Sequence, residues 1–191
     1  MNKSLCLVFL ILIIGPALIA QDSKSFYKSS YESRNSGSFE QSAALLTFGL
    51  GIPNVAGDHH DNNGFPPLYA KFEHGFLRDE VGLGGYISSG WGTTDKNGNN
   101  DDTNFSAFSF AILGYYHFNK LIPIKEMDVY AATGFAYRVV SYNDYYDNNN
   151  NARMVWRVGI RYYVKPKFAF YFESGDDGMS QVNMGITLKL K

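Results

Sequence analysis

From residue 43 onward, large apolar side chains alternate with small or polar ones along the chain. The stretch RMVWRVGIRYYV, residues 153–164, shows this pattern clearly, because Met154, Trp156 and Val158 open one row while Arg157 and Arg161 stand in the other. Only a strand, with its period of two, collects the large apolar groups on one side. The pattern therefore predicts a β-strand here.

Seven further stretches alternate in the same way, so we predict eight strands in all. Their apolar rows cover residues 46–52, 68–72, 81–91, 108–116, 129–139, 154–164, 168–172 and 182–190. The connections at 77–80, 119–127 and 165–167 are tight or moderate, whereas those at 53–65, 93–104 and 141–151 are long and polar, and a shorter polar one covers 174–180. Short turns at one end and long loops at the other predict an antiparallel up-and-down barrel.

The alternation alone allows either a soluble, lipocalin-like barrel with an apolar calyx or a membrane barrel whose apolar row faces lipid. An eight-stranded barrel has an interior only just wide enough to be filled by side chains, so rows of Phe, Trp, Leu and Ile do not fit inside it. The opposite rows are dominated by Gly, Ala, Ser and Tyr, which suit a crowded lumen better than a water-facing surface. We therefore predict an all-β, eight-stranded antiparallel transmembrane β-barrel over residues 43–191.

Aromatic side chains gather near both ends of the predicted strands, as they do in the two interfacial girdles of membrane barrels. The predicted girdle consists of Trp91, Trp156 and Tyr137 toward the long loops, and of Phe76, Tyr116, Phe118, Tyr162 and Phe168 toward the short turns.

The first residues have the features of a secretory signal peptide, which we predict over residues 1–20. A basic Lys3 precedes an apolar stretch, and Gly15-Pro16 interrupts that stretch too early for a membrane-anchor helix. The Ser-rich residues 21–42 lack periodicity and predict a flexible periplasmic leader. Cys6 is the only cysteine, so no disulfide is predicted, and a formal net charge of −1 argues against nucleic acid as a partner.

Charged residues in the inward rows predict an ion network that closes the lumen, because unpaired buried charges are very costly. The simplest register at the 165–167 turn places Glu173 opposite Gly159, diagonal to Arg157 and Arg161. We expect Glu173 to be held between these two guanidinium groups. The predicted network comprises Glu173, Arg157, Arg161, Arg138, Lys71, Glu73 and Lys189.

Few residues suggest chemistry beyond this network. His59 and His60, between Asp58 and Asp61, are weak candidates for a divalent cation, because adjacent residues rarely converge on one metal. His74 and His117 are the only histidines on predicted strands, and neither has an evident acidic partner for a catalytic triad. No catalytic residue and no cofactor is therefore predicted.

The stretches LYAKFEHGFLRDEVGLGGYISSG, DVYAATGFAYRVV and VNMGITLKLK resemble strands of the small outer-membrane β-barrel family, of the OmpX and OmpA-barrel type. The resemblance covers residues 43–191. It implies a location in the outer membrane of a Gram-negative bacterium, with outer-membrane lipid, periplasmic chaperones and the barrel-insertion machinery as partners. It also implies a structural, adhesive or partner-binding role through the long extracellular loops.

Two alternatives stay open at this stage. Some barrels of this size are lipid A acyltransferases or deacylases, and partners of a catalytic triad converge in space rather than in sequence. The charged lumen would alternatively provide a narrow ion path if its charges were not locked together.

Overall fold

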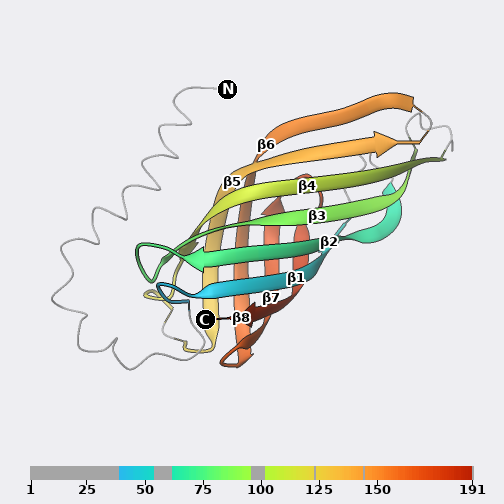
Figure 1. Ribbon diagram of the computed structural model, residues 1–191. Helices are drawn as coiled ribbons and strands as arrows, with labels where there is room; N and C mark the ends of the chain where they lie inside the picture. The colour runs from blue at the N-terminus through green and yellow to red at the C-terminus, as the bar shows by residue number, and fades with distance from the viewer. Residues whose placement is uncertain (1–38, 54–61, 96–101, 123, 144, 191) are drawn as a thin grey trace, which may run out of the picture. The chain divides into compact units, whose positions relative to one another are not determined.

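The computed structural model describes residues 39–53, 62–95, 102–122, 124–143 and 145–190. They form eight strands, which are β1 (Ala44–Ile52), β2 (Asn62–Gly75), β3 (Val81–Asp95), β4 (Asp102–His117), β5 (Met127–Tyr142), β6 (Tyr145–Lys165), β7 (Phe168–Asp176) and β8 (Val182–Lys189). Each strand pairs antiparallel with the next, and β1 pairs with β8, which closes the barrel (Figure 1). The predicted eight-stranded antiparallel barrel is confirmed.

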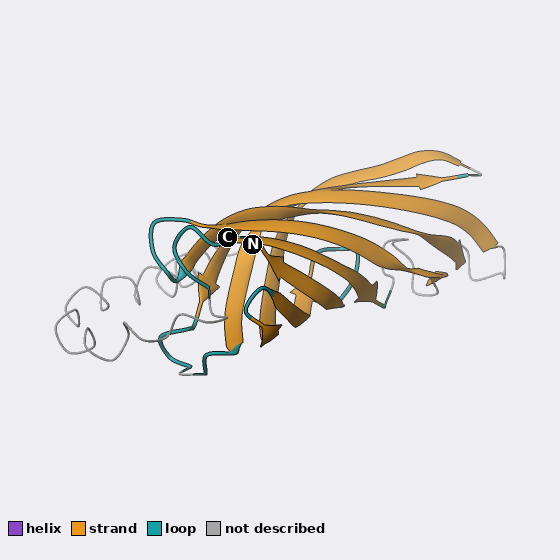
Figure 2. Ribbon diagram, turned by 60° about the horizontal axis from the view of Figure 1, so that its bottom comes forward, coloured by secondary structure: helices purple, strands orange, loops and turns teal. Residues whose placement is uncertain are grey.

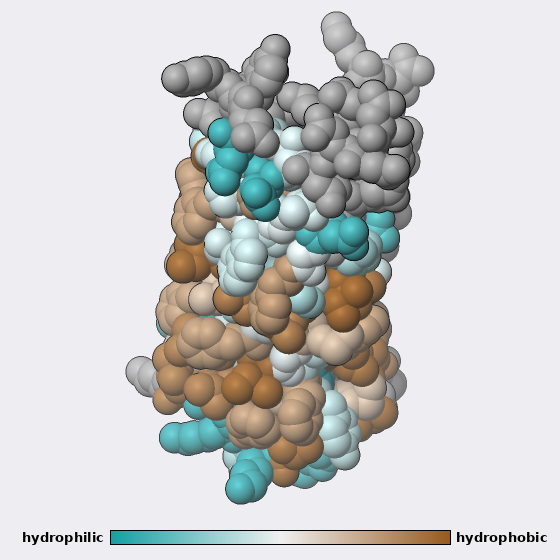
Figure 3. Space-filling model, turned by 90° about the vertical axis from the view of Figure 1, so that its right-hand side faces the viewer, coloured by the Kyte–Doolittle hydropathy of each residue, from teal (hydrophilic) through white to brown (hydrophobic). Residues whose placement is uncertain are grey.

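The barrel turns its large apolar side chains outward and its small and polar side chains inward. On β7, Phe170 and Phe172 are 54% and 48% exposed, whereas Ala169, Tyr171 and Glu173 between and beside them are buried. Figure 3 shows hydrophobic side chains covering much of the face that it presents below the residues drawn in grey. An apolar calyx is therefore the wrong alternative for this chain.

The two ends of the barrel differ, as the connection lengths predict. The turns β2–β3, β4–β5 and β6–β7 lie at one end, here called the short-turn end.

No helix within the described ranges has the length and apolar character needed to cross a membrane.

The β5–β6 hairpin is longer than the sequence indicates. Residues 141–151 were predicted as a polar loop, but pairing continues through Val139 with Asn150 and Val140 with Asn149 as far as Tyr142 with Tyr145. The prediction is wrong because backbone hydrogen bonds extend the ladder without any alternation of side chains. β5 and β6 consequently reach well beyond β7 and β8 (Figures 1 and 2).

The boundary predicted between the leader and the barrel also differs from the structure. Residues 39–42 were assigned to the flexible leader, yet Phe39 is only 2% exposed and packs with Ala43 and Leu45. The predicted signal peptide 1–20 and residues 21–38 of the leader lie outside the described residues.

Candidate functional site

The interior of the barrel holds a dense set of charged side chains. Four cationic side chains (Lys71, Arg138, Arg157, Arg161) and four carboxylates (Glu73, Asp128, Glu173, Asp177) are each at most 6% exposed. Their positions follow from the strand alternation, because each of them except Asp177 lies in the inward row of a strand. We call this set, together with His117, the lumen network.

Toward the short-turn end, four of these residues form a closed square, here called the lower cluster. Nδ1 of His117 lies 2.7 Å from Asp128 Oδ1, and its Nε2 lies 2.6 Å from Glu73 Oε1. Arg161 donates to the other oxygens of the same two carboxylates, at 2.8 Å to Asp128 Oδ2 and 2.6 Å to Glu73 Oε2. Both ring nitrogens donate only in the imidazolium form, which balances two cations against two anions.

The next layer of the lumen is centred on Glu173. Lys71 forms a buried ion pair with Glu173 Oε2, and the Tyr130 hydroxyl donates to Glu173 Oε1 at 2.6 Å. The Tyr130 ring also lies 4.0 Å below the guanidinium carbon of Arg161, so it links this layer to the lower cluster. A buried carboxylate thus has a cation and a hydroxyl donor, which offsets its loss of water.

The pairing predicted for Glu173 needs correction. Glu173 does lie opposite Gly159, yet neither Arg157 nor Arg161 forms an ion pair with it in the described part of the chain. The two guanidinium groups reach carboxylates that the sequence argument did not consider, Asp177 for Arg157 and Asp128 for Arg161. Lys71, which comes from β2 across the lumen, takes the place next to Glu173.

Above this layer, the β7–β8 connection folds into the lumen. Asp177, Met179 and Ser180 are fully buried, and we call residues 177–181 the inner loop. Asp177 accepts hydrogen bonds from the backbone N–H groups of Met179 (2.9 Å) and Ser180 (3.1 Å) and pairs with Arg157 Nη2 at 2.5 Å. The Tyr69 hydroxyl donates to the same carboxylate at 3.0 Å.

Arg138 and Gly178 fix the other side of the inner loop. Arg138 Nη1 donates to the Gly178 carbonyl at 2.8 Å. Gly178 has a φ of +77°, a left-handed backbone conformation that favours glycine, and a Cβ at this position would also displace the Arg153 guanidinium group. The inner loop thus fills the lumen between the Glu173 layer and the end opposite the short turns.

The remaining predicted residues lie at the edges of this arrangement. Lys189 lies at the short-turn end, where its Nζ is 3.0 Å from Glu40 Oε1. His59 and His60 lie outside the described residues. Six girdle residues are exposed outward, and two are half-buried. The exposed ones are Trp91, Trp156, Tyr137, Phe76, Tyr116 and Tyr162, and the half-buried ones are Phe118 and Phe168.

Sequence reasoning missed Asp128, Asp177, Tyr130 and Tyr69 as members of the site. Continuing the β5 alternation one step back from Tyr130 would have placed Asp128 inward, next to a known inward row. His117 was placed in an inward row but considered to lack an acidic partner, and the structure supplies two. Asp177 offered no such signal, because it lies in a loop whose inward course depends on tertiary contacts.

The geometry limits the chemistry that the lumen network can perform. Both nitrogens of His117 are occupied by carboxylates, so its ring has no free position from which to activate a hydroxyl nucleophile. His74 points outward and is exposed. Within the described residues, no group of three or more His, Cys, Asp or Glu side chains is arranged to hold a metal ion.

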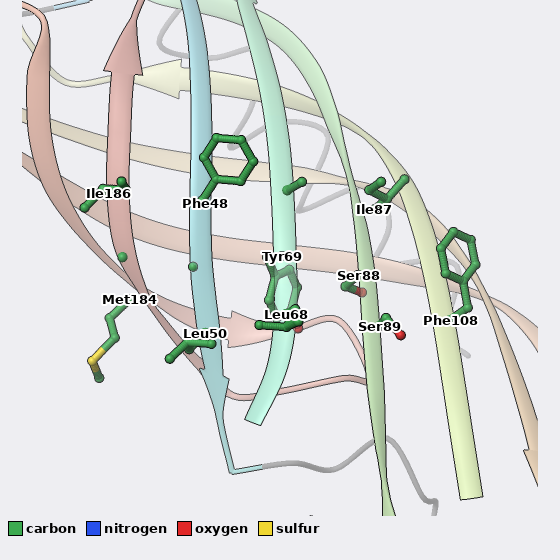
Figure 4. Close-up of a pocket in the computed structure, with 13 residues that line it drawn as sticks. Phe48, Leu50, Leu68, Tyr69, Ile87, Ser88, Ser89, Phe108, Met184 and Ile186 are labelled. Atoms are coloured by element: carbon green, nitrogen blue, oxygen red, sulfur yellow. The ribbon is translucent and has the colours of Figure 1, made fainter. Parts of the chain in front are cut away.

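A groove of about 630 Å³ lies on the outer face, across β8, β1, β2, β3 and β4 (Figure 4). Its lining includes the short side chains of Ala70 and Ser89, which interrupt the otherwise bulky outward rows. The large lining side chains are apolar and include Phe48, Leu50, Leu68, Ile87, Phe108 and Met184. The groove is open to the outside, and its apolar walls suit hydrocarbon better than water.

No protein-family model and no curated protein matches the sequence. Solved structures that are similar include Ail, the attachment invasion locus protein of Yersinia pestis, at 13% identity and a TM-score of 0.43, covering 80% of this chain and 95% of that one. Ail in complex with the heparin analogue sucrose octasulfate gives 11% identity and a TM-score of 0.45, covering 79% and 96%. The N-terminal β-barrel domain of Pseudomonas aeruginosa OprF gives 17% identity and a TM-score of 0.44, covering 79% and 99%. The barrel fold is assigned from the strand pairing within this chain and not from these similarities.

Proposed function

We propose that this chain is an integral outer-membrane barrel of a Gram-negative bacterium, with a structural or adhesive role exercised through its long-loop end. The observation that carries the proposal is the inverted distribution of side chains. Phe135, Ile112 and Phe172 are 73%, 69% and 48% exposed, whereas Arg161, Glu173 and Asp128 are at most 3% exposed. In water, the exposure of so many large apolar side chains would be strongly unfavourable. In a lipid bilayer the same outward face is favourable, because it contacts hydrocarbon.

The closed backbone ladder supports the same placement. Each strand pairs with two neighbours, so over the length that neighbouring strands share the barrel presents no open sheet edge to hydrocarbon, where an unpaired backbone group costs several kcal/mol, on the order of 2–7. The outer groove beside Phe48 and Leu68 is a natural place for lipid acyl chains. Outer-membrane lipid is therefore the first partner that we propose, with periplasmic chaperones and the barrel-insertion machinery acting during assembly.

The lumen supports a structural role more than transport. Lys71, Arg157 and Arg161 are paired with carboxylates of the lumen network, and the inner loop occupies the space above Glu173. Opening an ion path would require breaking several buried ion pairs at once, each costing about 3–5 kcal/mol when one partner is lost. We therefore propose that the barrel is a sealed support rather than a pore.

The contact with an extracellular partner is proposed for the end opposite the short turns. The β5–β6 hairpin projects beyond β7 and β8 at that end, and the connections that follow β1 and β3 begin there as well. A rigid barrel that presents projecting strands and loops is a suitable support for adhesion. In the described residues, no arrangement of side chains favours a particular partner or an enzymatic activity. The proposed role is therefore non-enzymatic.

The proposal is tested by expressing the full chain in a Gram-negative host and separating the membranes. A membrane barrel is expected in the outer-membrane fraction and migrates differently on gels before and after heating, because the closed barrel resists the detergent. Recovery of a freely soluble monomer whose migration does not change on heating would overturn the proposal. The lipid A of the same cells, analysed by mass spectrometry, should be unchanged; an added or missing acyl chain would instead support the enzymatic alternative.

A further inference from the structure

The chain immediately before β1 crosses the short-turn end of the lumen. We call residues 39–42 the mouth segment. Phe39 is 2% exposed and stacks on the His117 ring, with 3.7 Å between the ring centroids and 5° between the ring planes. Phe39 therefore covers the face of the lower cluster that is directed toward the short-turn end, away from the inner loop.

Polar contacts tie the mouth segment to three separate parts of the rim. Asn119 in the β4–β5 turn donates to the Phe39 carbonyl at 3.1 Å, and the Gln41 N–H donates to Asp79 Oδ1 in the β2–β3 turn at 2.9 Å. Glu40 pairs with Lys189 at the end of β8, at 3.0 Å. These contacts fix the segment across the opening rather than along one strand.

The rim is shaped to receive this segment. Gly75, the last residue of β2, lies under the backbone of Glu40, and a Cβ at this position would come within 2.3 Å of the Glu40 carbonyl oxygen. The Ser42 N–H donates to the Gly75 carbonyl at 3.2 Å, and the Gly75 N–H donates to the Ala43 carbonyl at 2.8 Å. A side chain at residue 75 would therefore displace the mouth segment.

We propose that the mouth segment is a lid that closes the short-turn end of the lumen and keeps water and small ions away from the lower cluster. The inner loop closes the lumen from the opposite side, so the network of buried charges lies between two closures built from the chain itself. Such ion pairs gain most when water is excluded, because the local dielectric is then low. The lid depends on the barrel, but not on the proposed membrane role.

The lid is tested by the access of a charged, membrane-impermeant methanethiosulfonate reagent to a thiol inside the lumen. Ala169 is suitable because it is fully buried, points inward and lies one residue into β7 at the short-turn end. The full chain carrying Cys6→Ser and Ala169→Cys has this single thiol. It is folded in detergent micelles, and heat-dependent gel migration is used to confirm the closed barrel.

Three further substitutions act on the lid in different ways. Gly75→Val displaces the Glu40 carbonyl, Phe39→Ala removes the ring that covers His117, and Asp79→Asn weakens only an exposed contact on a turn. Gly114→Val is the matched control for the glycine change, because a Cβ there meets only a backbone oxygen at 3.9 Å. Phe76→Ala is the matched control for the ring, since Phe76 is an exposed phenylalanine at the same end.

Labelling of the parent should be slow, and Gly75→Val and Phe39→Ala should each accelerate it at least about tenfold, since reactivity follows the open population. Asp79→Asn should accelerate it by about two- to threefold, and both controls should leave it unchanged. The proposal is overturned if the parent already reacts as fast as a free thiol, or if the folded lid variants stay as slow as the parent. If Gly75→Val or Phe39→Ala does not fold, Asp79→Asn still tests the lid, because it changes an exposed contact of the mouth segment. Failure of the membrane proposal would be seen in a different experiment, the membrane fractionation, as recovery of a soluble monomer.

Discussion

Replacement of Lys71 by methionine tests whether the lumen network stabilises the barrel. Lys71 and Glu173 are 6% and 2% exposed, so the substitution leaves a buried carboxylate without its cation. Removing one partner of a buried ion pair costs about 3–5 kcal/mol. Tyr130 still donates to Glu173 at 2.6 Å, which places the expected loss near the lower limit, about 3 kcal/mol.

A double substitution separates the charge from the packing. In Lys71→Met with Glu173→Gln, no charge is left alone, and the glutamine oxygen still accepts from the Tyr130 hydroxyl. We expect this variant to lie within about 1 kcal/mol of the parent, since well-packed neutral replacements of a buried pair are often tolerated. Relative to Lys71→Met, the second substitution should therefore restore about 2 kcal/mol of stability.

The free energy of unfolding is measured by urea titration of the protein folded in lipid vesicles. The two tryptophans, Trp91 and Trp156, both face outward, so their fluorescence reports the loss of the lipid environment. Lys120→Met is the comparison variant, because the Lys120 side chain is 59% exposed although its partner Glu80 is 7% exposed. Water reaches the Lys120 ammonium group and screens this pair, so the expected loss of stability is smaller than for Lys71→Met.

Two outcomes would refute the reasoning. One is a Lys71→Met variant as stable as the Lys120→Met control, because the buried charge would then cost nothing. The other is a double variant as unstable as Lys71→Met, which would show that the lysine contributes by packing and not by its charge.

Further substitutions address the outer face, the inner loop and the lower cluster. Phe172→Arg should lower the free energy of unfolding in vesicles by about 2–4 kcal/mol, whereas Leu121→Arg in a turn should have little effect; equal effects would contradict a lipid-facing β7. Asp177→Ala removes the acceptor of two backbone N–H groups, so amide hydrogen exchange in residues 177–181 should accelerate at least about tenfold. Unchanged protection would show that the inner loop does not depend on this carboxylate. Arg161→Met leaves two carboxylates with only His117 between them and should destabilise the barrel by about 3–5 kcal/mol in the same urea assay; a loss below about 1 kcal/mol would show that the square is not a stabilising unit.

Much of the fold could be predicted because alternation is a local property of the chain. The register of β6 and β7 is an example, since a short turn at 165–167 leaves few pairings that keep the apolar rows on one face, and Glu173 does lie opposite Gly159. The β5–β6 extension could not be predicted in this way. Its Asn-rich stretch has no alternating rows, and its pairing rests on backbone hydrogen bonds that every residue can form.

Most partners within the lumen depended on the closed barrel. Arg161 and Asp128 are direct partners in the β5–β6 ladder, but Arg161 also reaches Glu73 on the distant β2, and Lys71 reaches across from β2 to Glu173 on β7. Contacts across the lumen depend on which strands face each other after closure, and no spacing along the chain encodes that. The inward course of the inner loop and the docking of the mouth segment are decided in the same way.

The sequence by itself determined that the strands exist and which of their faces is apolar, because the period of two is set by backbone geometry alone. Only the tertiary structure decided which charge meets which, because ion pairs inside a narrow barrel are selected by proximity in space and by the cost of leaving any member unpaired.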